Sequence, residues 1–156
     1  MKKNLLRFGF LLALLVGAGS VWGQVNENFN AAALPSGWAS IGSPLWDVQQ
    51  CEGAGALGFN GAGDGAITPV IMNPNKLNFD KKRSSNSDAW SLKIEISDAS
   101  PASQTSGPWN TVVTITSISN TCSANSEIDL SLYSGTRYLR FTDTRGAGTS
   151  QRAIDN

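Results

Sequence analysis

Residues 88–97 carry the clearest alternation of apolar and polar side chains in the chain. Every second position in this segment is bulky and apolar, namely Trp90, Leu92, Ile94 and Ile96. A β-strand directs successive side chains to opposite faces, so the pattern predicts a strand with one buried face and one solvated face. Because an antiparallel sheet can leave one of its faces in water, the segment favours an antiparallel sheet.

Shorter apolar runs continue along the chain, with turn-forming residues between them. No long stretch of the region after residue 23 has the spacing of an amphipathic helix, and we therefore expect an all-β sandwich or barrel. Turns are expected at residues 34–38 and 61–65, where proline and glycine occur. The expected strands are residues 25–30, 45–50, 56–60, 66–69, 76–82, 88–97, 109–118, 127–132, 137–144 and 153–156.

The first 23 residues have the features of a secretory signal peptide. Lys2, Lys3 and Arg7 give a positive start, an apolar run follows from residue 8 to residue 16, and small residues lead to a cleavage site after Gly23. The apolar run is shorter than the ~20 residues that span a bilayer, which disfavours a retained membrane anchor. A buried N-terminal helix is the other alternative. We expect cleavage to leave residues 24–156 as one secreted or cell-surface domain without a membrane span.

Removal of the signal peptide would change the charge balance. The whole chain has twelve Lys and Arg residues and twelve Asp and Glu residues. Three of the basic residues lie before residue 24, so nine remain against twelve acidic ones, a net charge of −3. This balance disfavours a nucleic-acid-binding protein. The basic cluster at residues 81–83 is expected to be a solvated strand end or loop.

The residue types argue against catalysis by this domain. The chain contains no histidine, which excludes Ser-His-Asp and Cys-His arrangements, and it has no cluster with zinc-ligand spacing. No Lys-Ser/Thr pair of a phosphate-binding loop follows the glycine-rich residues 53–55 and 61–65. A glycosidase would need two carboxylates about 5–9.5 Å apart, and no spacing nominates such a pair. We expect a protein without enzyme activity, and a small hydrolase is the least favoured alternative.

Several short motifs occur in the order found in one family of extracellular domains. Residues 27–30 (Glu-Asn-Phe-Asn) and 34–38 (Leu-Pro-Ser-Gly-Trp) resemble the start of the cleaved-adhesin, or choice-of-anchor J, domains of secreted bacterial surface proteins. Together the similar segments extend over nearly all of residues 24–156. The other similar segments are residues 63–69, 88–97, 109–112, 128–131, 133–135, 137–141 and 153–156.

The resemblance implies a MAM-like, concanavalin-like jelly roll, which is an antiparallel two-sheet β-sandwich. It also implies a non-catalytic recognition or adhesion module that binds a glycan or a host or matrix protein. Such modules belong to larger secreted or cell-surface proteins. The alternative is a structural spacer or accessory domain of a secreted peptidase or glycosidase, without a ligand of its own. Because residues 153–156 are short for a strand of ~5–6 residues, we expect a C-terminally truncated copy of such a domain.

A structural calcium ion is the cofactor that the resemblance implies. In such domains an acidic residue of the first strand and an aspartate of the last strand clamp the ion, and the matching residues here are Glu27 and Asp155. Carboxylate oxygens suit calcium. Asp64, in a glycine-rich turn, and Asp143, at an inward-facing position of its expected strand, are further candidates. For each of these four residues, the alternative is an ordinary surface or turn residue that binds no ion.

Cys51 and Cys122 are the two cysteines of the chain. An even number of cysteines in an exported protein is compatible with a disulfide, and two separate thiols are the alternative. A bridge would close a loop of about 70 residues and stabilise the fold by ~4 kcal/mol in the chain-entropy model.

A glycan site would need exposed aromatic rings with hydrogen-bonding groups beside them. The two tryptophans at positions 46 and 90 alternate with apolar neighbours and are expected in the core. Trp38 lies in a turn and Trp109 at a strand entrance, where packing over the end of a sheet is the favoured explanation and an exposed ring is the alternative. The candidate ligand-binding residues are Trp38, Trp109, Asn110 and Arg140.

Overall fold

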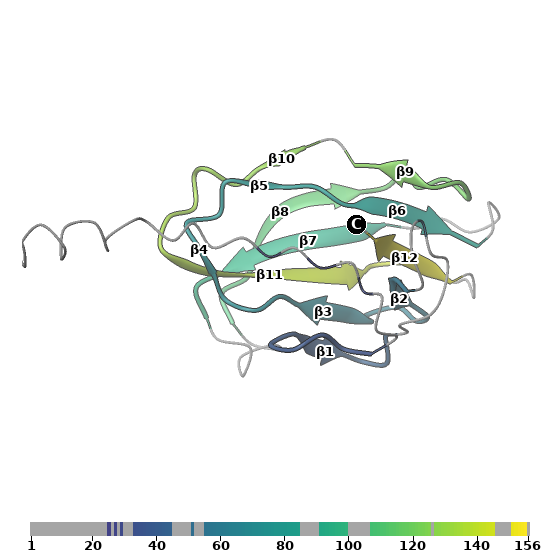
Figure 1. Cartoon of the computed structure of the whole chain (residues 1–156), viewed down its shortest axis with the longest axis horizontal. Helices are drawn as coiled ribbons and strands as arrows, with labels where there is room; N and C mark the ends of the chain where they lie inside the picture. Colours follow the sequence, from purple (N-terminus) through teal and green to yellow (C-terminus); the bar gives the residue numbers. More distant parts are fainter. Residues whose placement is uncertain are drawn as a thin grey trace, which may run out of the picture.

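In a computed structural model of this chain, the described residues form twelve β-strands with antiparallel pairing (Figure 1). The structure describes Val25, Glu27, Phe29, Cys51 and residues 33–44, 55–84, 91–99, 107–125, 127–145 and 151–155. The strands are β1 (Ala39–Ile41), β2 (Leu57–Phe59), β3 (Gly65–Ile67), β4 (Ile71–Met72), β5 (Lys76–Leu77), β6 (Asp80–Arg83), β7 (Leu92–Ser97), β8 (Asn110–Ile115), β9 (Ser123–Ala124), β10 (Ile128–Asp129), β11 (Thr136–Asp143) and β12 (Arg152–Asp155). These described residues include no helix that could span a bilayer.

The larger sheet has six strands. Its order is β1-β3-β11-β7-β8, and β4 pairs with the start of β11. The long strand β11 lies beside β7 over six residue pairs, from Tyr138 opposite Ser97 to Asp143 opposite Leu92. The prediction of an all-β antiparallel fold is therefore confirmed.

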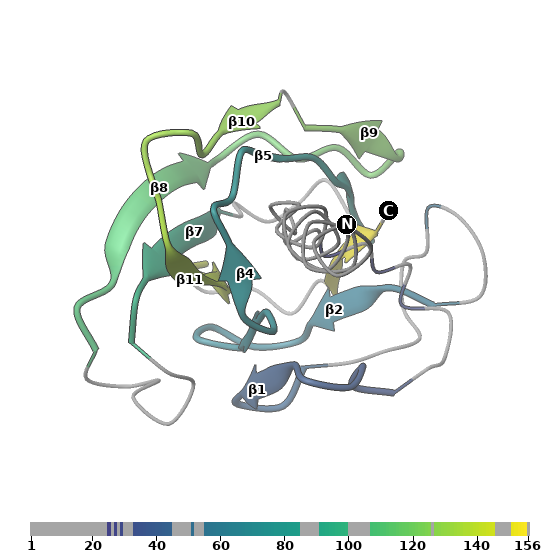
Figure 2. The ribbon, with the colours of Figure 1, turned by 60° about the vertical axis from the view of Figure 1, so that its left-hand side comes forward.

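A second sheet has the order β2-β12-β6-β9, and β5 and β10 form a separate two-stranded pair. Figure 2 shows β9 and β10 along one rim of the molecule and β1 along the opposite rim, with β7 and β11 between them. The late strand β12 is therefore held between two early strands, β2 and β6.

The core lies between the sheets and follows the predicted alternation. Leu92, Ile94 and Ile96 of β7 are at most 1 % exposed, and Leu139 and Phe141 of β11 are 2 % exposed. Each fully buried side chain of this size contributes roughly 1.5–3 kcal/mol relative to an exposed one. Strands β7 and β11 therefore anchor the hydrophobic core.

The opposite face of β7 is not solvated as the alternation predicts. Glu95 is 4 % exposed and Ser97 is 3 % exposed. The glutamate is buried because it is paired: Arg140 and Lys93 both bind its carboxylate. A buried charge is tolerated when it has ionic partners of this kind.

Strand boundaries follow the sequence pattern only in part. The predicted strand at residues 76–82 is divided into β5 and β6, while β1, β4 and β9 were not predicted. The predicted turn at residues 34–38 is confirmed, because the N–H of Trp38 donates to the carbonyl of Pro35 at 3.1 Å and Gly37 has a φ of +83°. The predicted strand at residues 45–50 and the tryptophans at 46 and 90 lie outside the described residues.

The basic cluster at residues 81–83 is not simply solvated. Lys81 is 7 % exposed, and its Nζ donates a hydrogen bond of 2.7 Å to the carbonyl of Ala124. Burial lowers the pKa of Lys81, and the neighbouring Asp80 carboxylate opposes this change. The prediction is wrong for Lys81 because the unpredicted strand β9 lies beside β6 and covers it.

A disulfide joins Cys51 to Cys122, with the two Cα atoms 5.4 Å apart. The bridge connects positions 71 residues apart. The backbone N–H of Cys51 also donates a hydrogen bond of 2.8 Å to Oδ2 of Asp155. Cys51 is therefore attached both to β12, through this hydrogen bond, and to the residue before β9, through the disulfide.

Replacing both cysteines by alanine should lower the free energy of unfolding by ~2–4 kcal/mol, because the unfolded chain loses a cross-link over a long loop. Urea denaturation without reductant measures this loss. The unmodified protein in dithiothreitol is the matched control and should show a similar loss. Equal stability of the variant and the oxidised protein would contradict the bridge.

Candidate functional site

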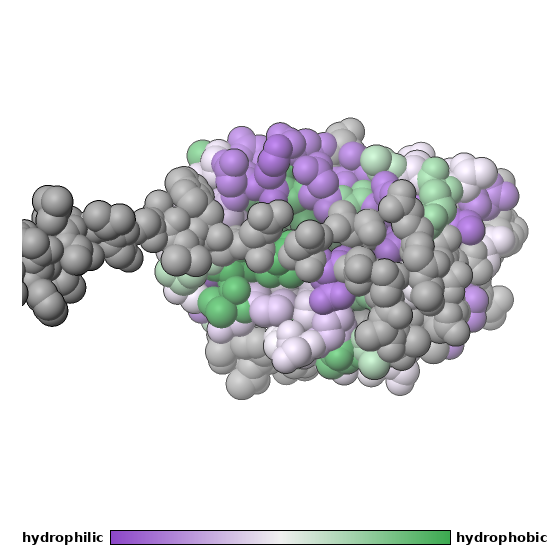
Figure 3. Space-filling model, viewed as in Figure 1, coloured by the Kyte–Doolittle hydropathy of each residue, from purple (hydrophilic) through white to green (hydrophobic). Residues whose placement is uncertain are grey.

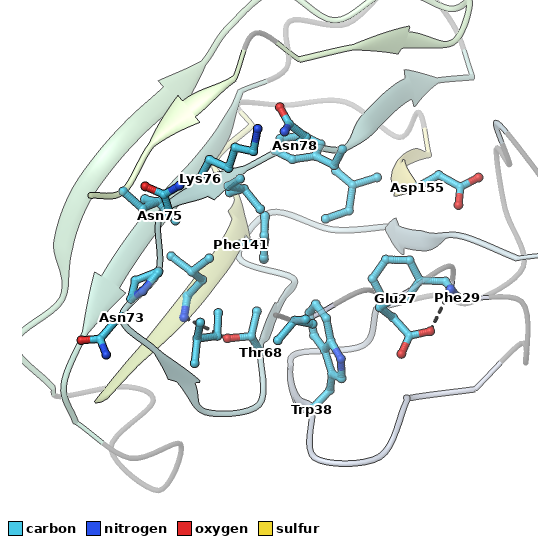
Figure 4. Close-up of a pocket in the computed structure, with 18 residues that line it drawn as sticks. Glu27, Phe29, Trp38, Thr68, Asn73, Asn75, Lys76, Asn78, Phe141 and Asp155 are labelled. Carbon is cyan, nitrogen blue, oxygen red and sulfur yellow. Dashed lines mark hydrogen bonds between the residues drawn. The ribbon is translucent and has the colours of Figure 1, made fainter. Parts of the chain in front are cut away.

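A pocket of about 540 Å³ opens between the two sheets beside the end of β12. This volume is in the range of ligand-binding pockets. Figure 3 shows apolar surface in the hollow of this face below a polar rim, and Figure 4 shows the lining side chains. The lining comes from the N-terminal segment, from the connection between β3 and β6, and from β11 and β12.

The floor of the pocket is apolar. Phe141, Leu139 and Ile71 line it, and all three belong to the buried core. Trp38 lies at one side, where its ring is stacked against Phe141 at 6.4 Å and meets Phe29 edge-on at 5.3 Å. Trp38 therefore packs over the open end of the core, as the favoured sequence interpretation expects.

The rim of the pocket is polar. Lys76 Nζ lies 3.0 Å from Oε2 of the exposed Glu127. The hydrogen bond from Lys76 and its positive charge hold the pKa of Glu127 below its ordinary value, and the Asn78 side chain adds to this effect. Asn73 Oδ1 accepts a hydrogen bond of 2.7 Å from the backbone N–H of Gly135. These contacts fix the rim beside the apolar floor.

Two of the four candidate calcium ligands also line this pocket. Glu27 and Asp155 lie on the same side of it in Figure 4. Oε1 of Glu27 accepts the backbone N–H of Phe29 at 3.0 Å, and Oδ2 of Asp155 accepts that of Cys51 at 2.8 Å. Within the described residues, no three acidic or cysteine side chains form a metal-binding group. A cation here would need backbone oxygens or water as further ligands.

The third candidate, Asp64, holds a loop together. Its carboxylate accepts backbone N–H groups from Ser43 at 3.0 Å, Asn60 at 3.1 Å and Gly61 at 2.7 Å. Gly42 lies against the same carboxylate, with a φ of +67° and no room for a Cβ. Carboxylates that accept several backbone N–H groups have a structural role of their own.

The fourth candidate, Asp143, belongs to a buried ionic cluster. Arg145 donates to its carboxylate from Nε at 2.6 Å and also from Nη2, and Arg152 Nη1 lies 3.9 Å from Oδ2. Asp143 and Arg152 are fully buried, and Arg145 is 7 % exposed. Two guanidinium groups already compensate this carboxylate, so it is a poor ligand for a cation.

A second polar group lies on the outer face of the larger sheet. We call Lys93, Glu95, Trp109 and Arg140 the outer-face cluster. Arg140 Nε donates to Glu95 Oε2 at 2.7 Å, and its guanidinium carbon lies 4.4 Å from the centroid of the Trp109 ring. Lys93 Nζ is 3.0 Å from Glu95 Oε1. Asn110, at the start of β8, is exposed, but it pairs with Ile96 and therefore lies on the opposite face of the sheet from this cluster.

The structure thus divides the sequence-predicted site residues into two groups. Trp38, Glu27 and Asp155 line the pocket, whereas Trp109 and Arg140 meet on the outer face. Sequence reasoning did not select Lys93 or Glu95. The sequence shows that Lys93 and Glu95 lie on the same face of a strand. It does not show the register that places Arg140 opposite Glu95.

The comparisons with known proteins identify the fold. Neither a family model nor a curated protein sequence matches the chain. Two similar solved structures are the K2 cleaved adhesin domain of Lys-gingipain and the K1 cleaved adhesin domain of Lys-gingipain from Porphyromonas gingivalis W83. They are 14 % and 18 % identical to this chain, each with a TM-score of 0.66. The alignments cover 84 % and 83 % of this chain and 95 % and 92 % of those domains.

A third similar structure is the CBM22-1 xylan-binding domain of Paenibacillus barcinonensis Xyn10C. It is 14 % identical, with a TM-score of 0.61, and the alignment covers 88 % of this chain and 94 % of that domain. At these identities the comparisons establish the fold alone. The chain has the fold of the cleaved-adhesin domains, and the resemblance seen in the sequence is confirmed at that level.

Replacing Asp64 by alanine should lower the free energy of unfolding by about 2–4 kcal/mol, because three backbone donors lose a charged acceptor. Chemical denaturation measures the change. The matched control is Asp98→Ala at an exposed position, which should change stability by less than about 0.5 kcal/mol. If the two variants are equally stable, Asp64 does not organise its loop.

Proposed function

We propose that this protein is an extracellular, non-catalytic recognition module that binds a carbohydrate chain at the outer-face cluster. The observation that carries the proposal is the contact of Arg140 and Glu95, which lie on regular strands, with Trp109 directly before β8. Sites built on strands hold their side chains more precisely than sites built on loops.

The chemistry of the cluster suits a polyhydroxyl ligand. An indole ring offers an apolar face and edge to the C–H groups of a sugar ring, while charged and amide groups bind its hydroxyls. Thr111 pairs with Glu95 and is exposed on the same face of the sheet. Arg140 and Glu95 hold each other in place, so binding would need little further ordering of side chains.

The similar folds support the same class of function. The domain of Xyn10C is described as xylan-binding, and the two domains of Lys-gingipain are described as cleaved adhesins. Export is supported by the predicted signal peptide and by the disulfide, since disulfides persist in oxidising extracellular environments.

A glycan array probed with the secreted protein tests this proposal. We expect saturable binding, which Trp109→Ala should weaken by about tenfold or more, the loss typical of a central aromatic contact. Thr116→Ala, at an exposed position after β8, is the surface control and should bind normally.

Two results would overturn the proposal. Loss of binding in Trp38→Ala but not in Trp109→Ala would move the ligand to the pocket. Silence on a broad array and on matrix proteins would favour the spacer or accessory domain without a ligand.

We also propose a structural calcium ion between Glu27 and Asp155. The two residues are far apart in the sequence, near the two ends of the described chain, but their carboxylates lie on one side of the pocket. Carboxylate oxygens are suitable ligands for calcium. We limit the proposal to this pair because the carboxylate of Asp64 already binds backbone N–H groups and that of Asp143 already binds arginine.

Added calcium should raise the melting temperature by about 3–6 °C, because an ion that binds only the folded state stabilises it. Glu27→Gln should abolish the increase. Glu127→Gln, which alters an exposed glutamate on the rim, should keep it. A melting temperature that neither calcium nor EDTA changes would exclude the site.

A further inference from the structure

A bulge in β8 places two hydroxyl groups beside the outer-face cluster. Thr114 lies opposite Lys93 of β7 and Thr111 lies opposite Glu95, so the register shifts by one residue between them. Residues three positions apart in a regular strand point to opposite faces, but the extra residue of a bulge lets these two threonines share a face. Both threonines are exposed. They lie on the face of Lys93 and Glu95, because residues directly opposite each other in a sheet share a face.

The polar side chains on this face form two rows across β8, β7 and β11, which lie side by side in Figure 1. The first row is Thr114, Lys93 and Thr142, and the second row is Thr111, Glu95 and Arg140. The Glu95 carboxylate connects the rows, since its Oε1 lies 3.0 Å from Lys93 Nζ and its Oε2 accepts from Arg140 Nε at 2.7 Å. Lys93 is thus one carboxylate away from the guanidinium group on which Trp109 stacks.

Lys93 is the charged group of the outer-face cluster that is most accessible to solvent. Its side chain is 33 % exposed, whereas those of Arg140 and Glu95 are 15 % and 5 % exposed. The cluster has two positive charges and one negative charge, which leaves a net charge of +1. A ligand that approaches from solvent therefore meets an ammonium group, while the carboxylate that partly compensates it is buried.

We propose that the outer-face cluster binds an acidic saccharide and that Lys93 pairs with the carboxylate of a uronic-acid residue. This rests on the carbohydrate binding proposed above and names the class of its ligand. A uronic acid carries its carboxylate directly on the sugar ring, so a saccharide that packs against Trp109 brings this charge to the neighbouring Lys93. The hydroxyls of Thr111 and Thr114 bind hydroxyls of the same saccharide.

The charge of Lys93 makes the site selective for acidic over neutral saccharides. Hydrogen bonds between an ammonium group and a carboxylate are roughly twice as strong as those between neutral groups, and a neutral sugar cannot form this pair. Residues 24–156 have an expected net charge of −3, and a negative domain does not attract polyanions non-specifically. A preference for acidic saccharides therefore has to arise at a local positive site.

The test uses the secreted protein and matched pairs of oligosaccharides. Oligomers of galacturonate, mannuronate and glucuronate are each compared with their carboxyl methyl esters, which keep the same rings and linkages but lack the charge. Neutral oligosaccharides and sulfated neutral oligosaccharides complete the set. Titration calorimetry should show that the acidic form of the best ligand binds about tenfold tighter than its methyl ester.

Two variants at one position separate charge from structure. Lys93→Gln should weaken binding of the acidic form by about tenfold and leave that of the ester unchanged, because only the acid pairs with the ammonium group. Lys93→Arg retains the positive charge and should keep the preference for the acid within about threefold. Lys82→Gln, in β6 of the second sheet, is the matched control and should bind both forms normally.

The outcomes distinguish this inference from the proposed function on which it rests. Equal binding of acids and esters, or binding of neutral or sulfated sugars alone, would overturn the inference and keep a carbohydrate site if Trp109→Ala abolishes binding. A preference for the acid that persists in Lys93→Gln would place the carboxylate elsewhere. Binding of no saccharide at all would overturn both proposals. The comparison of acid and ester on the unmodified protein keeps the test decisive if Lys93→Gln does not fold.

Discussion

The antiparallel ladder between β7 and β11 is the interaction on which the rest of the structure depends. Its six residue pairs set which side chains of both strands face the core and which face outward. Inward, Ile94 lies opposite Phe141, and both belong to the hydrophobic core between the sheets. Outward, Glu95 lies opposite Arg140 and forms the centre of the outer-face cluster. A shift of one residue would exchange these faces and destroy both.

Buried charges close one end of this ladder. Asp143, the last residue of β11, is compensated by Arg145 and Arg152. Since Arg152 begins β12, the cluster connects the larger sheet to the central strand of the second sheet. Removing the Asp143 carboxylate would take away the anion that both buried guanidinium groups share, which is strongly destabilising. The arginines therefore help to fix the relative position of the sheets, and with it the shape of the pocket.

The sequence predicts the scaffold well and the sites poorly. The alternation in β7 and β11 can be recognised from the sequence of each strand alone. Apolar residues occur there at every second position, namely Leu92 and Ile94 in β7 and Leu139 and Phe141 in β11. The burial of Glu95 could not be predicted, since it depends on a partner 45 residues away in the chain. Short strands such as β4 and β9 also carry no clear pattern, because their pairing depends on neighbours that are distant in the sequence.

The central claim is that carbohydrate binds at the outer-face cluster and not in the pocket. Nitrogen-15 NMR of the tryptophan indole groups, during titration with the oligosaccharide that the protein binds, tests it most directly. We expect the Trp109 indole signal to shift progressively to saturation while the Trp38 signal stays in place. A shift of Trp38 with no change at Trp109 would contradict it.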